Sequence, residues 1–202
     1  MEKKIWIYFL FYKPYGVLCQ FSGNEKGATL KDFGPFPKEI YPVGRLDADS
    51  EGLVLLTNDG ALKHYLLEPK YGHTRTYCVQ VERIPTEDAL QRLRNGVMIG
   101  GRTAKPAAVR LLTEDPDLPL RSVSIRYRKT VPTAWLEIIL REGRNRQVRK
   151  MTAAINHPTL RLVRIAIESL TIRGLNPGEH REIASSEIQK LFGNRLPDRR
   201  IH

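Results

Sequence analysis

Hydrophobic positions along the chain follow two periods, one typical of strands and the other of helices. Short runs rich in β-branched and aromatic residues predict strands within 5–19, 53–57, 74–81, 109–112, 123–127, 134–140 and 160–170. Apolar residues three and four positions apart predict helices that begin near Asn58, at the N-cap Thr86, after Gly143 and near Ser186. Because strands outnumber helices and hairpin-like neighbours occur among them, we expect an α+β fold with a mixed, largely antiparallel sheet.

The segment between Gly23 and Lys38 is richer in glycine, proline and charge than its neighbours. Such a composition predicts a surface connection. The chain shows no internal repeat and no low-complexity linker. The pattern of hydrophobic positions therefore marks no domain boundary by itself.

The chain has 202 residues, 41% of them hydrophobic and 27% charged, which is ordinary for a globular protein and excludes wholesale disorder. Its 33 Lys and Arg against 22 Asp and Glu give a formal net charge of +11 at pH 7. Because basic side chains that neutralise phosphates release bound counterions, a polyanion is the leading partner. RNA, DNA and an anionic membrane surface all satisfy this criterion.

Cys19 and Cys78 stand far apart with no CxxC or His-Cys cluster nearby, so neither a disulfide framework nor a zinc site is indicated. A reducing, cytoplasmic compartment is the simplest interpretation. The apolar run from Ile5 to Phe11 has no small-residue cleavage site after it and is far shorter than the roughly 20 residues of a membrane helix. We expect a buried strand there.

Three carboxylates, Asp47, Asp49 and Glu51, crowd into a loop bounded by glycines. A solvated turn is the ordinary explanation for any one of them. Their spacing also matches the opening of a calcium-binding loop, but the twelfth position, which needs a glutamate ligand, is Asn58. Calcium binding is therefore not expected.

A second polar cluster spans 141–151 and places basic and amide side chains at the opening of a helix. Cations are disfavoured at a helix N-terminus, so a bound phosphate would explain them, whereas an exposed charged face is the ordinary alternative. At the head of a predicted strand, Arg75 precedes Tyr77. The tyrosine is either a core residue or an aromatic platform for a nucleic-acid base.

These segments together resemble the pseudouridine synthases, and within them the bacterial branch that modifies ribosomal RNA. Residues 11–17, Phe-Tyr-Lys-Pro-Tyr-Gly-Val, are similar to the first motif of that branch. Residues 44–60, which open with Gly-Arg-Leu-Asp, are similar to the motif that carries its catalytic aspartate. Residues 75–77 and 142–149 follow in the order of its tyrosine and arginine motifs, so the match spans nearly the whole chain.

The chain departs from this branch in two respects. The family often has lysine at the position of Arg75, which keeps the charge and changes its geometry. Most members also carry a small RNA-binding domain ahead of the catalytic one, and the Lys13-Pro14 motif begins too early to leave room for it, so we expect none here. Together with residues 159–164, this absence most resembles the subgroup that acts on 23S ribosomal RNA.

The resemblance implies a pseudouridine synthase fold with two lobes around the sheet and a central cleft. We expect the catalytic domain to span 1–192, with a lobe boundary near 60–75, and a basic C-terminal tail at 193–202. Isomerising uridine to pseudouridine needs no redox change and no group donor, so no cofactor and no metal ion is expected. The expected partner is 23S ribosomal RNA or a large-subunit precursor, with no membrane, and the expected form is a cytoplasmic monomer.

By this resemblance Asp47 is the essential catalytic residue, which attacks the sugar or stabilises positive charge on it. Arg144 would be the partner that keeps this aspartate ionised and oriented. Tyr77 would stack on the uracil or accept a proton. Basic residues of the motifs would hold the substrate, mainly by its phosphates: Lys13, Arg45, Arg75, Arg146, Arg149 and Lys150. For Arg45, a structural ion pair with a nearby carboxylate is the alternative.

Two other functions fit parts of the sequence. A non-catalytic RNA-binding or ribosome-assembly factor would explain the charge alone. A metal-dependent nuclease would use Asp47, Asp49 and Glu51. The three hypotheses differ in their product. The isomerase forms pseudouridine, the RNA-binding factor forms no product, and the nuclease cleaves the RNA strand only when a divalent cation is present.

Overall fold

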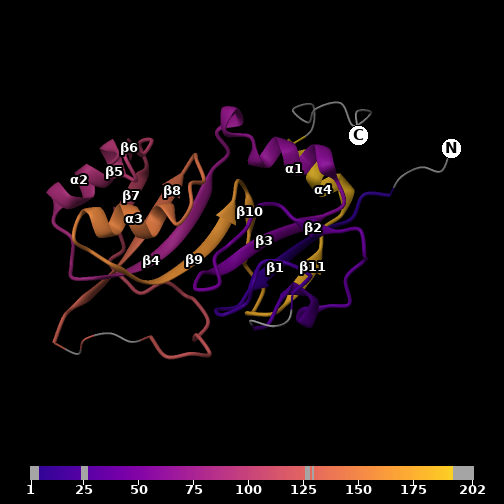
Figure 1. The fold of residues 1–202 in the computed structure, drawn as a ribbon, viewed down its shortest axis with the longest axis horizontal. Helices are drawn as coiled ribbons and strands as arrows, with labels where there is room; N and C mark the ends of the chain where they lie inside the picture. Colours follow the sequence, from indigo (N-terminus) through magenta and orange to yellow (C-terminus); the bar gives the residue numbers. More distant parts are fainter. Residues whose placement is uncertain (1–4, 24–26, 126–127, 129, 193–202) are drawn as a thin grey trace. The chain divides into compact units, whose positions relative to one another are not determined.

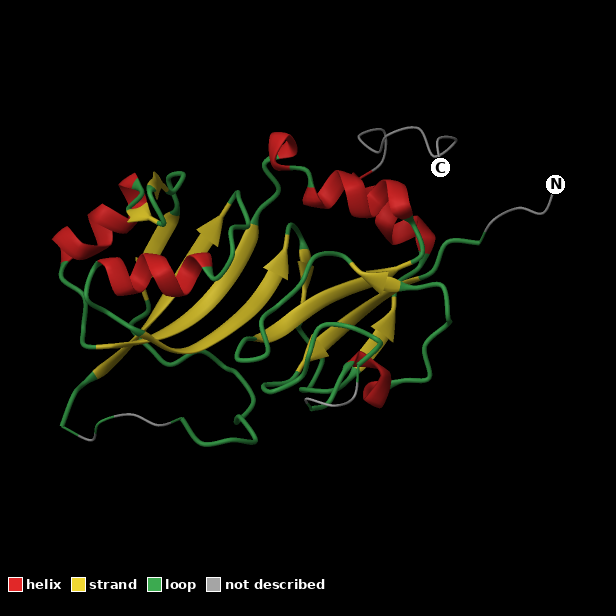
Figure 2. Cartoon of the chain, in the orientation of Figure 1, coloured by secondary structure: helices red, strands yellow, loops and turns green. Residues whose placement is uncertain are grey.

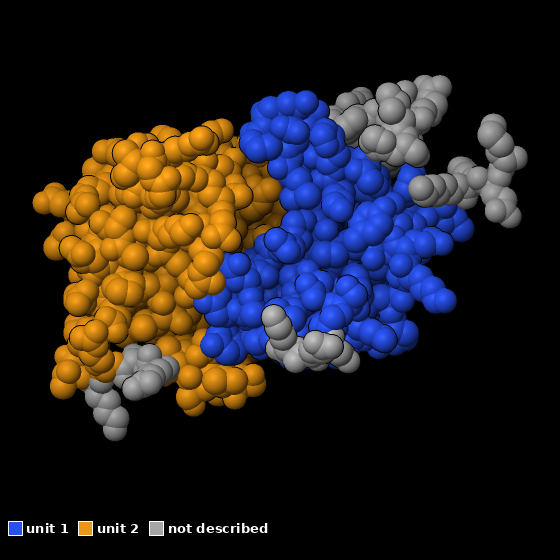
Figure 3. All heavy atoms as spheres, in the orientation of Figure 1, with its two compact units in different colours: residues 1–71, 169–202 blue, residues 72–168 orange. Residues whose placement is uncertain are grey.

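The computed structural model describes residues 5–23, 27–125, 128 and 130–192. Within this part of the chain, strands are combined with four α-helices, so the predicted α+β class is confirmed (Figures 1 and 2). The chain forms two compact units, which Figure 3 colours separately. Unit 1 comprises 1–71 together with 169–202, and unit 2 comprises 72–168. The chain passes from unit 1 to unit 2 after residue 71 and returns after residue 168. The predicted tail 193–202 lies outside the described residues.

Unit 1 is built around a strand that is buried along its whole length. Its elements are β1 (Tyr8–Lys13), β2 (Tyr41–Pro42), β3 (Glu51–Thr57), β10 (Leu170–Thr171), β11 (His180–Glu182), α1 (Gly60–Leu67), α4 (Ser185–Phe192) and the 3₁₀ turns Leu30–Phe33 and Pro69–Tyr71. β1 lies between β11 and β3, and both pairings are antiparallel. Every residue of β3 is buried, which explains its continuous apolar sequence in place of an alternating one.

Unit 2 is an antiparallel sheet with two helices. Its elements are β4 (Arg75–Glu82), β5 (Met98–Ile99), β6 (Arg102–Thr103), β7 (Ala108–Leu111), β8 (Thr133–Leu140), β9 (Thr159–Ile167), α2 (Glu87–Asn95) and α3 (Gln147–Ala154). The strand order is β9-β4-β8-β7, and these pairings are antiparallel. β5 and β6 form a separate short hairpin.

The predicted starts of α1 and α2 are confirmed by their caps. Asp59 accepts a hydrogen bond from the backbone N–H of Leu62 at the start of α1. Thr86 caps α2 in the same way through the N–H of Ala89. Gly96 ends α2 with φ 89°, a backbone conformation that favours glycine.

Two expectations are wrong, a strand at 123–127 and a purely surface connection at 23–38. The strand expected at 123–127 is absent at 123–125, and 126–127 lie outside the described residues. The Arg121 side chain donates to the carbonyls of Val123 (2.6 Å) and Ser124 (3.0 Å), so a side chain takes the place of a strand partner. The segment 23–38 is also more than a surface connection, because Leu30 in its 3₁₀ turn is fully buried in the core of unit 1.

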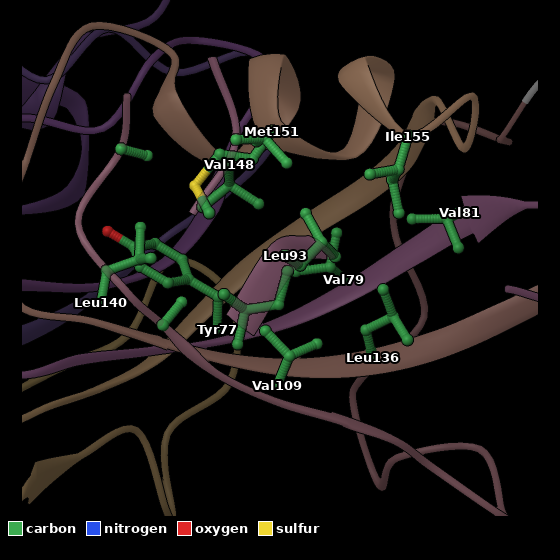
Figure 4. Packing of buried hydrophobic residues seen from close by; sticks show 14 of the residues in the cluster. Tyr77, Val79, Val81, Leu93, Val109, Leu136, Leu140, Val148, Met151 and Ile155 are labelled. Carbon is green, nitrogen blue, oxygen red and sulfur yellow. The ribbon is translucent and has the colours of Figure 1, made fainter. Parts of the chain in front are cut away.

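The core of unit 2 joins the inner face of its sheet to both helices. Figure 4 shows Val79 and Val81 of β4 packed with Leu93 of α2 and Met151 of α3. Leu93 and Met151 are both fully buried. Apolar burial at such positions is the main source of stability for the unit.

We expect Leu93→Ala to lower the free energy of unfolding by about 2–5 kcal/mol, because it leaves a cavity in this core. The matched control is Leu120→Ala, which removes a leucine that is 94% exposed in the same unit and is expected to change stability by less than about 0.5 kcal/mol. Urea denaturation followed by circular dichroism measures both. Equal effects of the two variants would contradict the placement of Leu93.

Candidate active site

Asp47 lies in a turn between β2 and β3 of unit 1. The backbone N–H of Ser50 donates to the carbonyl oxygen of Asp47 at 3.0 Å, which closes the turn. The preceding residue, Leu46, is buried in the core of unit 1. Asp47 itself is half-buried. The local fold thus fixes the backbone on both sides of the carboxylate while leaving the residue partly accessible.

The side chain of Lys13 anchors this turn from below the surface. Lys13 is fully buried at the end of β1. Its ammonium donates to three backbone carbonyl oxygens, those of Pro14 (2.9 Å), Val17 (2.8 Å) and Ala48 (3.5 Å). The N–H of Gly16 donates to the same Ala48 oxygen at 2.7 Å. The loop after β1 and the Asp47 turn are therefore joined through one buried ammonium and one carbonyl.

The prediction that Lys13 contacts substrate phosphates is wrong, because its side chain has no exposed surface. Burial lowers the pKa of Lys13 from 10.5 to about 8. The negative charges that oppose this shift include those of Glu51, Asp49 and Asp47. Lys13 is thus a structural cation within electrostatic reach of the acidic loop.

The second half of the aspartate motif, residues 57–60, ties β3 to β1. The hydroxyl of Thr57 donates to the carbonyl of Ile7 at 2.7 Å, and Oδ1 of Asn58 accepts from the N–H of Ile7 at 2.9 Å. Asp59 accepts from the Tyr8 hydroxyl at 2.8 Å in addition to capping α1. These three polar residues are buried and structural.

The surroundings of Arg45 and of the loop carboxylates bear on two alternatives, a structural ion pair of Arg45 and a metal-dependent nuclease. Arg45 is exposed, and within the described residues no hydrogen bond or ion pair holds its side chain, so a structural ion pair does not account for it. Asp47, Asp49 and Glu51 form no group that could hold a metal ion in the part of the chain that the structure describes. The nuclease hypothesis therefore lacks a ligand cluster at this loop.

Tyr77 lies on β4 in unit 2 and is only 8% exposed. It packs in the hydrophobic core of that unit, and its hydroxyl lies at the edge of the cluster drawn in Figure 4. The β4–β9 pairing shifts register between Thr76 and Tyr77. Such irregularities re-aim side chains and are common beside functional sites. The ring is held firmly by the core, as expected if Tyr77 is a core residue.

Arg75 stands at the start of β4 among charged neighbours. Burial lowers the pKa of Arg75, while the charges of Tyr77 and Glu168 oppose this effect and that of Arg164 adds to it. Its guanidinium donates to the carbonyl of His73 at 3.3 Å. Arg75 is half-buried, so a role in holding substrate stays a prediction.

Glu168 organises this end of unit 2 and was missed from the sequence. Its carboxylate accepts from the backbone N–H and the hydroxyl of Thr74 and approaches Nδ1 of His73 at 3.3 Å. Its own N–H donates to the carbonyl of Thr74 at 3.0 Å. The residue joins the end of β9 to the start of β4, next to Arg75. Nothing in the local sequence pattern signals this long-range contact.

The guanidinium of Arg144 holds the β5–β6 hairpin, another element that the sequence pattern does not show. It donates to three backbone carbonyl oxygens, those of Ile99 (2.6 Å), Arg102 (3.2 Å) and Thr103 (3.5 Å). The donors are the two terminal nitrogens, so the Nε–H and one terminal N–H take no part in these three hydrogen bonds. Its proposed pairing with Asp47 stays a prediction.

The basic start of α3 divides into exposed and half-buried side chains. Arg146 and Lys150 are exposed, and Nζ of Lys150 approaches Oδ1 of Asn145 at 3.4 Å. Arg149 is half-buried and donates to the carbonyl of Thr159 at 3.4 Å. Among these three, Arg146 and Lys150 have the accessibility that a phosphate contact requires.

The pKa of Lys13 gives a test of the buried ammonium. As pH rises through about 8, the folded chain releases this proton, whereas the unfolded chain keeps it up to its ordinary pKa of 10.5. The unfolded state therefore binds more protons in this window, and the Lys13 contribution to unfolding free energy rises with pH from about 8 to 10.5. We expect the Cε resonance of Lys13, assigned with Lys13→Met, to titrate near pH 8. A midpoint near the ordinary value of 10.5 would contradict the burial.

Comparisons with known proteins agree with the resemblance that the motifs carry. A family model described as RNA pseudouridylate synthase matches residues 7–154. Ribosomal large subunit pseudouridine synthase E of Vibrio vulnificus (strain CMCP6) is 50% identical over 183 residues, which are 91% of this chain and 76% of that protein. The protein of the same name from Xanthomonas axonopodis pv. citri (strain 306) is 52% identical over 170 residues, 83% of this chain and 89% of that protein.

A solved structure supports the same fold. The crystal structure of a pseudouridylate synthase superposes with a TM-score of 0.76 at 29% identity, covering 94% of this chain and 75% of that one. The family model and both relatives cover most of the chain, so the family predicted from the motifs is confirmed. The chain belongs to the RNA pseudouridylate synthase family, enzymes that isomerise uridine in RNA to pseudouridine.

Proposed function

We propose that this enzyme isomerises a specific uridine of 23S ribosomal RNA to pseudouridine. The observation that carries the proposal is the Asp47 turn, in which a half-buried carboxylate stands on a backbone anchored by Lys13 and follows the exposed Arg45. The Vibrio and Xanthomonas relatives, 50% and 52% identical, are both named ribosomal large subunit pseudouridine synthase E, which supports a large-subunit RNA substrate for this enzyme. The net charge of +11 fits an RNA substrate.

The reaction breaks the bond between N1 of uracil and C1′ of ribose and forms a bond between C5 and C1′. The electron pair of the first bond leaves with the uracil, and C1′ becomes electron-poor. The Asp47 carboxylate either bonds to C1′ or stabilises its positive charge. After the uracil turns, C5 supplies the pair for the new bond, the C5 proton is lost, and N1 gains a proton. Atoms and electrons balance within the nucleotide.

The proposed roles of the other two residues follow from how each is held. The ring of Tyr77 is fixed by the core of unit 2, which suits stacking on the uracil, and its hydroxyl is the proton acceptor in the alternative role. Arg144 keeps the Nε–H and one terminal N–H outside its carbonyl bonds. We propose that these donors act on the catalytic carboxylate or on the substrate.

The target base must leave its stack to reach a carboxylate, at a cost of a few kcal/mol. Exposed cations that bind phosphates offset this cost. Arg45, Arg146 and Lys150 are exposed, and Arg75 and Arg149 are half-buried. We propose the first three as phosphate contacts and the other two as residues that shape the pocket for the base.

We also propose that the protein acts as a cytoplasmic monomer. Cys19 and Cys78 are both buried, and neither forms a disulfide within the described part of the chain, which suits a reducing compartment. Burial raises the pKa of Cys78 to about 11, so its thiol stays protonated at neutral pH. No helix among the described residues is long and apolar enough to span a lipid bilayer.

We expect Asp47→Asn to abolish pseudouridine formation in 23S ribosomal RNA transcripts, with a loss of at least about 10⁴-fold, because an amide cannot attack C1′ or stabilise its charge as a carboxylate does. The matched control is Asp49→Asn, which removes a carboxylate two residues away in the same turn and is expected to retain activity. Mass spectrometry of nuclease digests, after reaction with mass-labelled uridine, measures the product.

Each outcome of this experiment separates the hypotheses. Full activity of Asp47→Asn would refute the assigned role of the aspartate. Salt-sensitive binding of the transcript without any product from the wild-type protein would indicate the non-catalytic RNA-binding factor. Strand cleavage that stops when EDTA is added would indicate the nuclease, whereas pseudouridine formed in EDTA excludes that route.

A further inference from the structure

One face of α1 in unit 1 is open to solvent. Residues 60, 63, 64, 67 and 68 share that face through their helical spacing, and with Pro69 they line a shallow hollow of about 350 Å³. Leu67 on this face is 38% exposed. Tyr41 of the adjacent β2 is 39% exposed. Large apolar groups are thus accessible in one small area.

The ring of Tyr41 is held in place without being buried. β2 pairs with β3, with Tyr41 opposite Thr57, and α1 begins three residues after β3 ends. Nζ of Lys63 on α1 lies 4.6 Å from the centroid of the Tyr41 ring, a cation–π contact. An exposed aromatic ring and a cation are therefore presented together.

This area is continuous with the Asp47 turn. Gly44 has φ 74°, and a Cβ atom built there would lie 3.1 Å from Cδ2 of Leu67. The backbone next to Arg45 therefore lies directly against α1. Arg45 is exposed, and the described residues give its side chain no ion pair. The segment that leads to Arg45 and Asp47 thus contacts the hollow's lining residue Leu67 at Gly44, within one unit of the fold.

We propose that the surface formed by Tyr41, Arg45, Lys63 and Leu67, the α1 platform, binds the single-stranded RNA next to the target uridine. A base stacks on Tyr41, and neighbouring phosphates contact Lys63 and Arg45. Proteins bind single-stranded RNA with this combination of exposed aromatic rings and cations. The inference rests on the proposed function, because it takes RNA as the substrate, and it assigns part of the recognition to residues outside the catalytic motif.

Four single variants of the full-length protein test the platform. Tyr41→Ala is expected to raise the KM for 23S ribosomal RNA transcripts about tenfold while kcat changes less than about twofold, because a stacking contact is lost away from the reacting atoms. Tyr41→Phe keeps the ring and is expected to restore the affinity. Lys63→Gln is expected to reduce the slope of log affinity against log salt by about 0.7–1. Lys31→Gln, which removes an exposed lysine on a 3₁₀ turn, is the matched control.

The results decide the inference whether or not the proposed function holds. Filter binding of the same transcripts gives dissociation constants that need no turnover, so the platform is judged even if the wild-type protein makes no pseudouridine. A normal dissociation constant for Tyr41→Ala, or equal salt slopes for Lys63→Gln and Lys31→Gln, overturns the platform. If Tyr41→Ala lowers the midpoint temperature of thermal unfolding, the comparison of Lys63→Gln with Lys31→Gln decides the inference by itself.

Discussion

A buried ammonium, that of Lys13, holds the turn that carries Asp47, the residue proposed to be catalytic. Removing the charge of Lys13 from water is unfavourable, and the carbonyls of Pro14, Val17 and Ala48 offset that cost by accepting hydrogen bonds from its ammonium. These carbonyls belong to the loop after β1 and to the turn that carries Asp47. The backbone of the Asp47 turn is therefore held by hydrogen bonds from an ammonium whose burial lowers its pKa to about 8.

The long aspartate motif combines chemistry with architecture. Its first part presents Arg45 and Asp47, one exposed and one half-buried. Its second part is buried, and there Thr57 and Asn58 hold the start of β1 while Asp59 caps α1. Because β1 also supplies Lys13, the second part fixes the strand that positions the first.

The sequence predicts what depends on local pattern and misses what depends on long-range contact. The helix start near Asn58, the cap at Thr86, the apolar run of β3 and the family motifs are all local, and they are confirmed. The phosphate contact assigned to Lys13 is wrong, because motif position does not reveal burial. The carboxylate of Glu168 and the carbonyl partners of Arg144 depend on strands and hairpins that meet only in the folded unit. No spacing rule encodes these contacts.

The claim that Asp47 converts a uridine of large-subunit RNA is tested most directly in cells. Pseudouridine is mapped across all ribosomal RNA from a strain with this gene, a strain without it, and a strain complemented with Asp47→Asn. Modification is expected to vanish at a uridine of 23S ribosomal RNA when the gene is absent, and to return with the wild-type gene only. An unchanged map, or recovery with Asp47→Asn, would contradict the claim.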